Sequence, residues 1–172
     1  VGASDETDRE LLETTWRLTA EIGLARSYFS GFCPVPDTPL EGREPVAPGR
    51  EARLYQAEFL MRSYGFSFNE LVFDDEGMMP LDRDPKMVSA LARRDEFPIE
   101  VNAADRWELL RVPGIGPTAA ERIMALRGKH KLTSLRHLEV LGARPERARN
   151  FVTLNGHYFP REEPAMQLSM GL

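Results

Sequence analysis

A glycine-rich turn in the C-terminal half carries the residues with the clearest chemical potential. The turn reads Val112-Pro113-Gly114-Ile115-Gly116-Pro117-Thr118 and lies between two segments with helical spacing of apolar residues. Glycine reaches backbone angles that are closed to other residues and lets a partner approach the main chain closely. We expect Ile115 to enter the core, while the amides of Gly114, Gly116 and the next helical turn point outward. Such a helix N-terminus favours an anion such as phosphate.

A weaker copy of this turn follows 28 residues later. The copy reads Val140-Leu141-Gly142-Ala143-Arg144-Pro145-Glu146-Arg147-Ala148. Gly142 corresponds to Gly114, and Pro145 corresponds to Pro117. Arg144 stands where the first copy has Gly116, so the second turn lacks its second glycine. The repeat predicts two helical hairpins in tandem, with Ala148 and Phe151 in the places of Ala120 and Ile123.

The charge distribution marks the same region. The chain has 172 residues and a net charge of −5, with 42% hydrophobic and 28% charged residues, which is a globular composition. Residues 101–150 hold 10 basic against 5 acidic side chains, whereas residues 1–100 hold 11 against 20. Because charges act locally and are screened within about 10 Å, the acidic total does not exclude an anionic partner for the basic segment.

The turn and its copy resemble the helix-hairpin-helix motif, which implies binding to DNA phosphates without base reading. Gly114, Ile115, Gly116 and Thr118 would form the phosphate cradle. The expected DNA-binding residues are Arg111, Gly114, Ile115, Gly116, Thr118, Arg122, Arg127, Lys129, Lys131, Gly142, Arg144 and Arg147. The same hairpins could instead serve only for protein–protein contact, and this alternative stays open. For the second hairpin, DNA contact and a plain surface role for Arg144 are both open.

Other chemistries find little support in the sequence. The three histidines, His130, His137 and His157, have no ligand-spaced Cys or carboxylate partners, so no metal site is expected. An Asp in the position typical of hairpin-type DNA glycosylases is absent, because no Asp follows Asp105. The acidic run Asp74-Asp75-Glu76 is interpreted as a solvated turn rather than a Mg²⁺ site. No apolar run approaches the roughly 18–20 residues of a membrane span, so no membrane partner and a cytoplasmic location are expected.

The elements before the hairpins follow from caps, prolines and apolar spacing. We predict a helix capped by Thr7 or Asp5 and ended by Gly23, then a strand over Ala25–Phe32 and a proline-rich extended segment. A second helix should run from Arg50 to Gly65, followed by a short helix after Ser67 and one from Asp84-Pro85 to about Arg94. Asn102 is predicted to cap the helix that precedes the first glycine turn.

The N-terminal part resembles the last helix and strand of radical S-adenosylmethionine (radical SAM) barrels. The resemblance rests on Gly2, Glu6, Thr7 and Asp8, and on Phe32-Cys33-Pro34-Val35-Pro36-Asp37-Thr38-Pro39-Leu40, where Asp37 replaces a usual Gly. Together with Arg53-Leu54-Tyr55-Gln56-Ala57, Asp84-Pro85-Lys86 and the hairpins, the chain resembles the C-terminal part of the DNA modification/repair radical SAM proteins. That family is often found beside a uracil-DNA glycosylase-like protein.

The resemblance implies that the cofactors and the DNA-binding module lie in different parts of a longer parent enzyme. Its [4Fe–4S] cluster and S-adenosylmethionine would belong to an N-terminal radical SAM domain with three cysteines, whereas this chain has only Cys33, expected to be a packed thiol. No catalytic residue, cofactor or metal is therefore assigned to this chain, which would be a fragment that docks DNA.

The sequence thus predicts a mainly α fold built from successive parts. They are a barrel remnant with partial α/β character (1–41), a Pro/Gly-rich linker (42–50), an α-helical connector (51–101), a tandem helix-hairpin-helix module (102–156) and a tail (157–172). A barrel remnant has an unpaired sheet edge. We therefore expect Ala25–Phe32 to be less well ordered, or to pair with another chain, unless the helix from Arg50 covers it.

Overall fold

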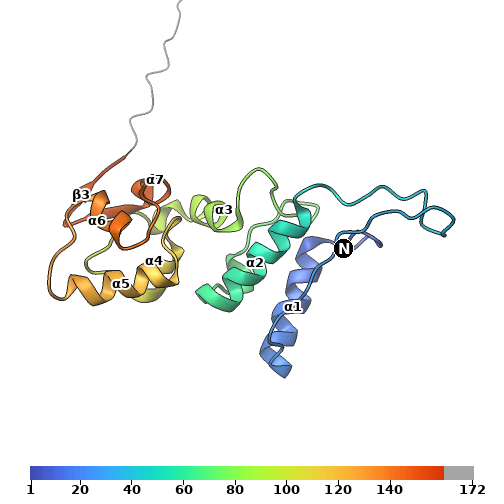
Figure 1. The fold of residues 1–172 in the computed structure, drawn as a ribbon, viewed down its shortest axis with the longest axis horizontal. Coiled ribbons are helices and arrows are strands. Elements are labelled where there is room, and N and C mark those ends of the chain that lie inside the picture. The colour runs from blue at the N-terminus through green and yellow to red at the C-terminus, as the bar shows by residue number, and fades with distance from the viewer. Residues whose placement is uncertain (161–172) are drawn as a thin grey trace, which may run out of the picture. The chain divides into compact units, whose positions relative to one another are not determined.

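The computed structural model describes residues 1–160, and the chain divides into two compact units, 1–94 and 95–172 (Figure 1). The first unit contains α1 (Asp8–Ile22), α2 (Arg50–Tyr64), the 3₁₀ turn η1 (Phe68–Glu70) and α3 (Pro85–Ala92), and η2 (Arg94–Glu96) spans the boundary. The second contains β1 (Ile99–Glu100), α4 (Arg106–Arg111), α5 (Pro117–Arg127), α6 (Leu135–Val140), α7 (Pro145–Ala148), η3 (Arg149–Phe151), β2 (Val152–Leu154) and β3 (His157–Tyr158). The mainly helical prediction is confirmed for the described residues.

Helix boundaries in the first unit follow the predicted caps. Thr7 caps α1 in a reciprocal capping box with Glu10, and Gly23 ends that helix at a φ of 70°. Gly65 ends α2 in the same left-handed conformation, and Asp84 caps α3. Helix α1 packs against α2 (Figure 1). Their shared core is the cluster Leu12, Phe29, Leu54, Ala57, Leu71 and Met79.

The predicted strand Ala25–Phe32 is wrong, because this segment forms no strand in the structure. Side chains of α2 bind its backbone instead. The Tyr55 hydroxyl accepts a hydrogen bond from the Phe29 amide at 3.0 Å and donates one to the Phe29 carbonyl at 2.9 Å. The Glu51 carboxylate accepts a bond from the Gly31 amide at 2.7 Å. The helix from Arg50 therefore covers this segment, and residues 1–41 share one core with α2.

A buried ion pair joins the start of α1 to the start of α2. Arg50 Nε donates to Asp8 Oδ1 at 2.7 Å, and both side chains are almost fully buried. The second Asp8 oxygen accepts the Met79 amide at 2.9 Å, and Arg50 also donates to the Glu6 carbonyl. Every partner is thus satisfied by hydrogen bonds, which is the condition under which a buried pair is tolerated.

The second unit contains a small three-stranded sheet, formed by segments that precede and follow its helices. Strands β1 and β2 pair in parallel, with Ile99 opposite Val152, and β2 pairs antiparallel with β3. The sheet brings together the chain before α4 and after α7. The predicted module boundaries at 102 and 156 are therefore too narrow, because β1 precedes 102 and β3 lies in the predicted tail. None of the described helices combines the length and apolarity needed to cross a membrane.

Candidate nucleic-acid interface

The two glycine turns form two helical hairpins, α4–α5 and α6–α7. Gly114 and Gly142 have φ values of 89° and 92°, so both turns use the same left-handed step. Behind each turn the matching apolar residues are buried: Ala120 and Ile123 after the first, Ala148 and Phe151 after the second. The 28-residue repeat in the sequence is thus a repeat of backbone conformation and of buried positions.

The hairpins contact each other directly through their turns. The Arg144 amide donates to the Gly114 carbonyl at 2.8 Å. A Cβ atom at Gly114 would lie 2.5 Å from the Arg144 carbonyl oxygen and 3.0 Å from the Arg147 Cβ. Gly114 therefore acts as a packing residue between the hairpins. Its predicted place in the phosphate cradle, through its amide, stays a prediction.

Ile115 is also a core residue rather than a cradle residue. Its side chain is 1% exposed, as expected for the residue that enters the core, and its amide donates to the Val112 carbonyl at 3.1 Å. Neither its side chain nor its amide faces an outside ligand. The part of the predicted cradle at the start of α5 is Gly116 and Thr118, which we name the α5 cradle.

The α5 cradle is an uncapped helix N-terminus. Gly116 occupies the N-cap position, which supplies no side-chain oxygen, and Pro117 follows at the first helical position. Within the described residues, the amides of Gly116 and Thr118 donate to no acceptor, and Thr118 is exposed. By contrast, the Asp105 carboxylate occupies the N-terminus of α4 in a capping box with Glu108. Because unpaired amides and the helix dipole add up at this point, the cradle has a positive potential.

The predicted basic residues fall into three groups. Arg144 is exposed on the second turn, Arg147 lies half-buried beside Gly114, and Arg111 lies half-buried at the end of α4. Arg122 is exposed and reaches the Leu141 carbonyl, at 3.5 Å, so its guanidinium lies over the open Gly142 turn. Lys129 and Lys131 are exposed, but they follow α5, whose 11 residues span about 16 Å from the cradle. They can therefore contribute only longer-range attraction.

Arg127 belongs to the framework rather than to the surface. Its guanidinium donates to the Val101 carbonyl at 2.9 Å and to the Ala104 carbonyl. These bonds fasten the end of α5 to the turn before α4. This structural role comes in addition to its predicted long-range charge toward DNA, which stays a prediction.

Two residues have structural roles that the sequence did not predict. Asn102 binds the basic loop 128–134, and Glu100 binds the segment before α4 and the turn between β2 and β3. Asn102, predicted as a helix cap, instead exchanges two hydrogen bonds with Leu132, at 2.9 Å and 2.8 Å. The cap of α4 is Asp105. The Glu100 carboxylate accepts bonds from the amides of Asn102, Asn155 and Gly156. No local sequence signal predicts the contacts of Asn102 with Leu132 or of Glu100 with Asn155 and Gly156, since these partners lie 30 to 56 residues apart.

The electrostatics of Glu100 follow from these bonds. Burial raises the pKa of its carboxyl, but the three amides and the Asn102 side chain outweigh burial and hold the pKa at about 2. The Thr153 hydroxyl adds a further bond at 3.0 Å. Glu100 is therefore an ionised anchor for the turn between β2 and β3 and for the segment that leads into α4.

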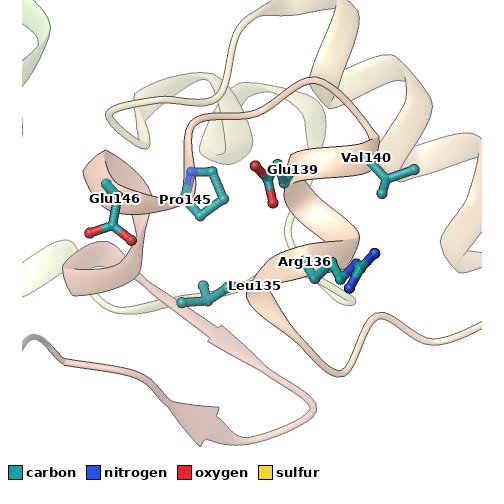
Figure 2. A pocket seen from close by; sticks show the side chains of 6 residues that line it. All are labelled: Leu135, Arg136, Glu139, Val140, Pro145 and Glu146. Carbon is teal, nitrogen blue, oxygen red and sulfur yellow. The ribbon is translucent and has the colours of Figure 1, made fainter.

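A shallow hollow of about 460 Å³ lies between α6 and α7 on the second hairpin (Figure 2). Leu135, Val140 and Pro145 form its apolar lining, and Val140 is 75% exposed. Glu139 and Glu146 also line it, with one cation, Arg136. Because two carboxylates outnumber one guanidinium, this hollow does not favour phosphate.

The remaining polar candidates are placed away from any shared site. The three histidines are exposed, and His137 Nδ1 accepts the Thr133 amide at 3.2 Å. In the acidic turn, the Asp74 carboxylate binds the amides of Glu76 and Met78. No group of three His, Cys, Asp or Glu residues among 1–160 is arranged to hold a metal ion. Cys33 is exposed, so its expected burial is wrong.

Comparisons with protein-family profiles, with curated proteins and with solved structures found no match to this chain.

Proposed function

We propose that residues 95–160 form a tandem helix-hairpin-helix module that binds the phosphate backbone of DNA without reading its sequence. The observation that carries this proposal is the uncapped, exposed N-terminus of α5 at the turn Gly114–Gly116. An anionic oxygen at Gly116 and Thr118 would take the unpaired amides and the positive end of the helix dipole.

The surrounding charge supports phosphate as the anion. Residues 101–150 carry a local excess of five positive charges. Arg144 and Arg147 lie at the contact between the two turns, next to Gly114. A backbone cradle flanked by guanidinium groups fits a phosphate and contains no group aimed at a base edge. We infer that the first hairpin supplies amides, whereas the second supplies the Arg144 side chain, because its own amide is bonded to Gly114.

The test is a fluorescence-anisotropy titration of the chain with two duplexes of unrelated sequence over a range of salt. We expect similar affinities for both duplexes and a log–log salt slope of about −0.9 per phosphate contacted. Arg144→Gln should reduce the steepness by about 0.9. Arg17→Gln, which removes an exposed arginine from α1, is the matched control and should leave the slope unchanged.

A second candidate function is protein–protein contact through the same hairpins. The observation that favours it is the hollow between α6 and α7, with its exposed Val140. The salt titration separates the two functions. The absence of duplex binding at low salt, or an affinity that does not change with salt, would favour protein contact and refute the proposed DNA function.

We further propose that the module docks DNA for a radical SAM enzyme with a role in DNA modification or repair. This proposal rests on the sequence resemblance of residues 1–41, 51–101 and 102–152. The cluster and S-adenosylmethionine would be held by an N-terminal domain of the same protein, and a uracil-DNA glycosylase-like protein would be a partner. Three cysteines spaced Cys-x-x-x-Cys-x-x-Cys in the reading frame upstream of Val1 would support it, and their absence would contradict it.

A further inference from the structure

The first unit carries an exposed patch in which arginine side chains lie over aromatic rings. The guanidinium of Arg26 lies 5.1 Å from the ring centre of Tyr28, and that of Arg62 lies 5.2 Å from the ring centre of Phe59. Tyr28 is 76% exposed and Phe59 is 44% exposed. We name these four residues the aromatic patch.

The two pairs of the patch are neighbours around one hollow. Arg26, Phe59 and Arg62 line a depression of about 390 Å³, within the ~300–1,000 Å³ range of small-ligand sites. A T-shaped contact with Tyr64, at 5.7 Å between ring centres, fixes the Phe59 ring. The patch is thus a preformed surface on α2 and the segment before it.

The charge of the hollow favours an anionic ligand. Its charged lining consists of Arg26, Arg62 and Glu58, so two cations face one carboxylate. Glu58 is buried and accepts a hydrogen bond from Arg62 at 2.7 Å, which orients the guanidinium. No carboxylate among the described residues pairs with Arg26.

We propose that the aromatic patch binds unpaired nucleotides of a DNA strand, with bases stacked on Tyr28 and Phe59 and phosphates paired with Arg26 and Arg62. Flat bases stack on aromatic rings and on guanidinium planes, and guanidinium groups match phosphate oxygens. A duplex buries the faces of its bases, so the patch selects single-stranded or unpaired DNA. The inference rests on the proposed function for the choice of nucleic acid, but it concerns a different unit of the chain.

The experiment measures binding of the full chain to labelled oligothymidylate of about 12 nucleotides and to a matched duplex, at low salt. In the Tyr28→Ala, Phe59→Ala double variant, affinity for the single strand should fall about tenfold or more. Its affinity for the duplex should not change. Arg26→Gln, a change at an exposed side chain, should also weaken single-strand binding. Tyr158→Ala is the control, because Tyr158 is an exposed aromatic of the other unit, on β3.

The outcomes separate this inference from the proposed function. Single-strand binding that is absent in the native chain, unchanged in both patch variants, or equally weakened by Tyr158→Ala overturns the role of the patch. If the patch variants change self-association in sedimentation and not DNA affinity, the patch is a protein contact. This result also overturns the inference. If the duplex is not bound but single-strand binding depends on Arg26, the hairpin proposal fails and the patch proposal stands.

Discussion

Gly114 and Gly142 show how one backbone conformation serves two purposes. Both have a φ near 90°, a region in which side chains other than hydrogen are strained. Gly114 is also enclosed, because the Arg144 carbonyl lies where its Cβ would be. Around Gly142 only the flexible end of Arg122 comes near. The first glycine is required for the turn and for packing, whereas the second is required for the turn alone.

Gly114→Ala should therefore destabilise the second unit by about 2–4 kcal/mol, from left-handed strain and the overlap with the Arg144 carbonyl. Urea unfolding followed by Trp107 fluorescence in a Trp16→Phe background measures this change. Gly128→Ala is the control, since Gly128 has a φ of −67° and no atom within 4 Å of its Cβ position. It should be neutral, and an equal loss in both variants would contradict the packing role of Gly114.

Glu100 should make the second unit sensitive to acid. Its pKa of about 2 in the folded chain lies below the ordinary 4.5, so the stabilisation is complete above pH 4.5 and is lost as the pH falls toward 2. Glu100→Gln should lower stability at neutral pH and flatten the acid side of the profile, measured by the same Trp107 fluorescence. Glu139→Gln, which alters an exposed carboxylate on α6, should keep the native profile. A native acid profile in Glu100→Gln would contradict the role of the anchor.

At the scale of elements, a substitution in the first turn of α5 can change DNA binding without lowering the stability of the helix. A carboxylate at an exposed first-turn position stabilises a helix through its dipole, but it competes with an external anion for the same amides. Thr118→Glu should therefore leave thermal stability equal or slightly higher, and should weaken duplex binding about tenfold or more. Ala125→Glu adds the same charge near the other end of α5 and should weaken binding less. Equal losses in the two variants would show that only net charge matters.

Most helices could be predicted from the sequence because their ends are encoded locally. Thr7, Gly65 and Asp84 lie within a few residues of the backbone groups that they cap or end. The segment Ala25–Phe32 could not be predicted, because its backbone binds side chains of α2 that lie 20 to 26 residues away and the backbone of Val1 and Val46. Its pattern is typical of a strand, but no strand of the described chain lies beside it.

The candidate site was predictable in position but not in detail. The glycine spacing located both turns and the core role of Ile115. The spacing could not show that the second hairpin packs against Gly114, or that Arg127 binds the carbonyls of Val101 and Ala104. Both facts depend on how segments distant in the sequence pack, and basic residues look alike in a sequence whether they face solvent or the framework.

At the scale of the whole molecule, each unit has its own core and its own polar network, which is buried in the first unit and partly buried in the second. The first is organised by Asp8 and Arg50, and the second by Glu100 and Asn102. Networks of this kind stabilise only the unit in which all of their partners lie. We therefore expect damage to one unit to leave the other folded.

Arg50→Met tests this independence. Loss of the guanidinium leaves the buried Asp8 carboxylate without its cation, which should cost about 3–5 kcal/mol and unfold the first unit selectively. Trp16 fluorescence should change at a lower urea concentration, whereas the duplex affinity of the hairpins should be retained. Arg43→Met removes the partner of the exposed Asp5 carboxylate and should have a smaller effect. Loss of duplex binding in Arg50→Met would contradict independent units.

The Tyr55 hydroxyl has a consequence for how this chain behaves at high concentration. A single phenol occupies both the amide and the carbonyl of Phe29, and Glu51 occupies the Gly31 amide. These are the groups through which extended segments of different molecules join into aggregated sheets. Side chains of helix α2 thus cover hydrogen-bonding groups of the extended segment. Removing one oxygen atom with Tyr55→Phe would leave the amide and carbonyl of Phe29 unpaired, which favours opening of the segment and strand addition by another molecule.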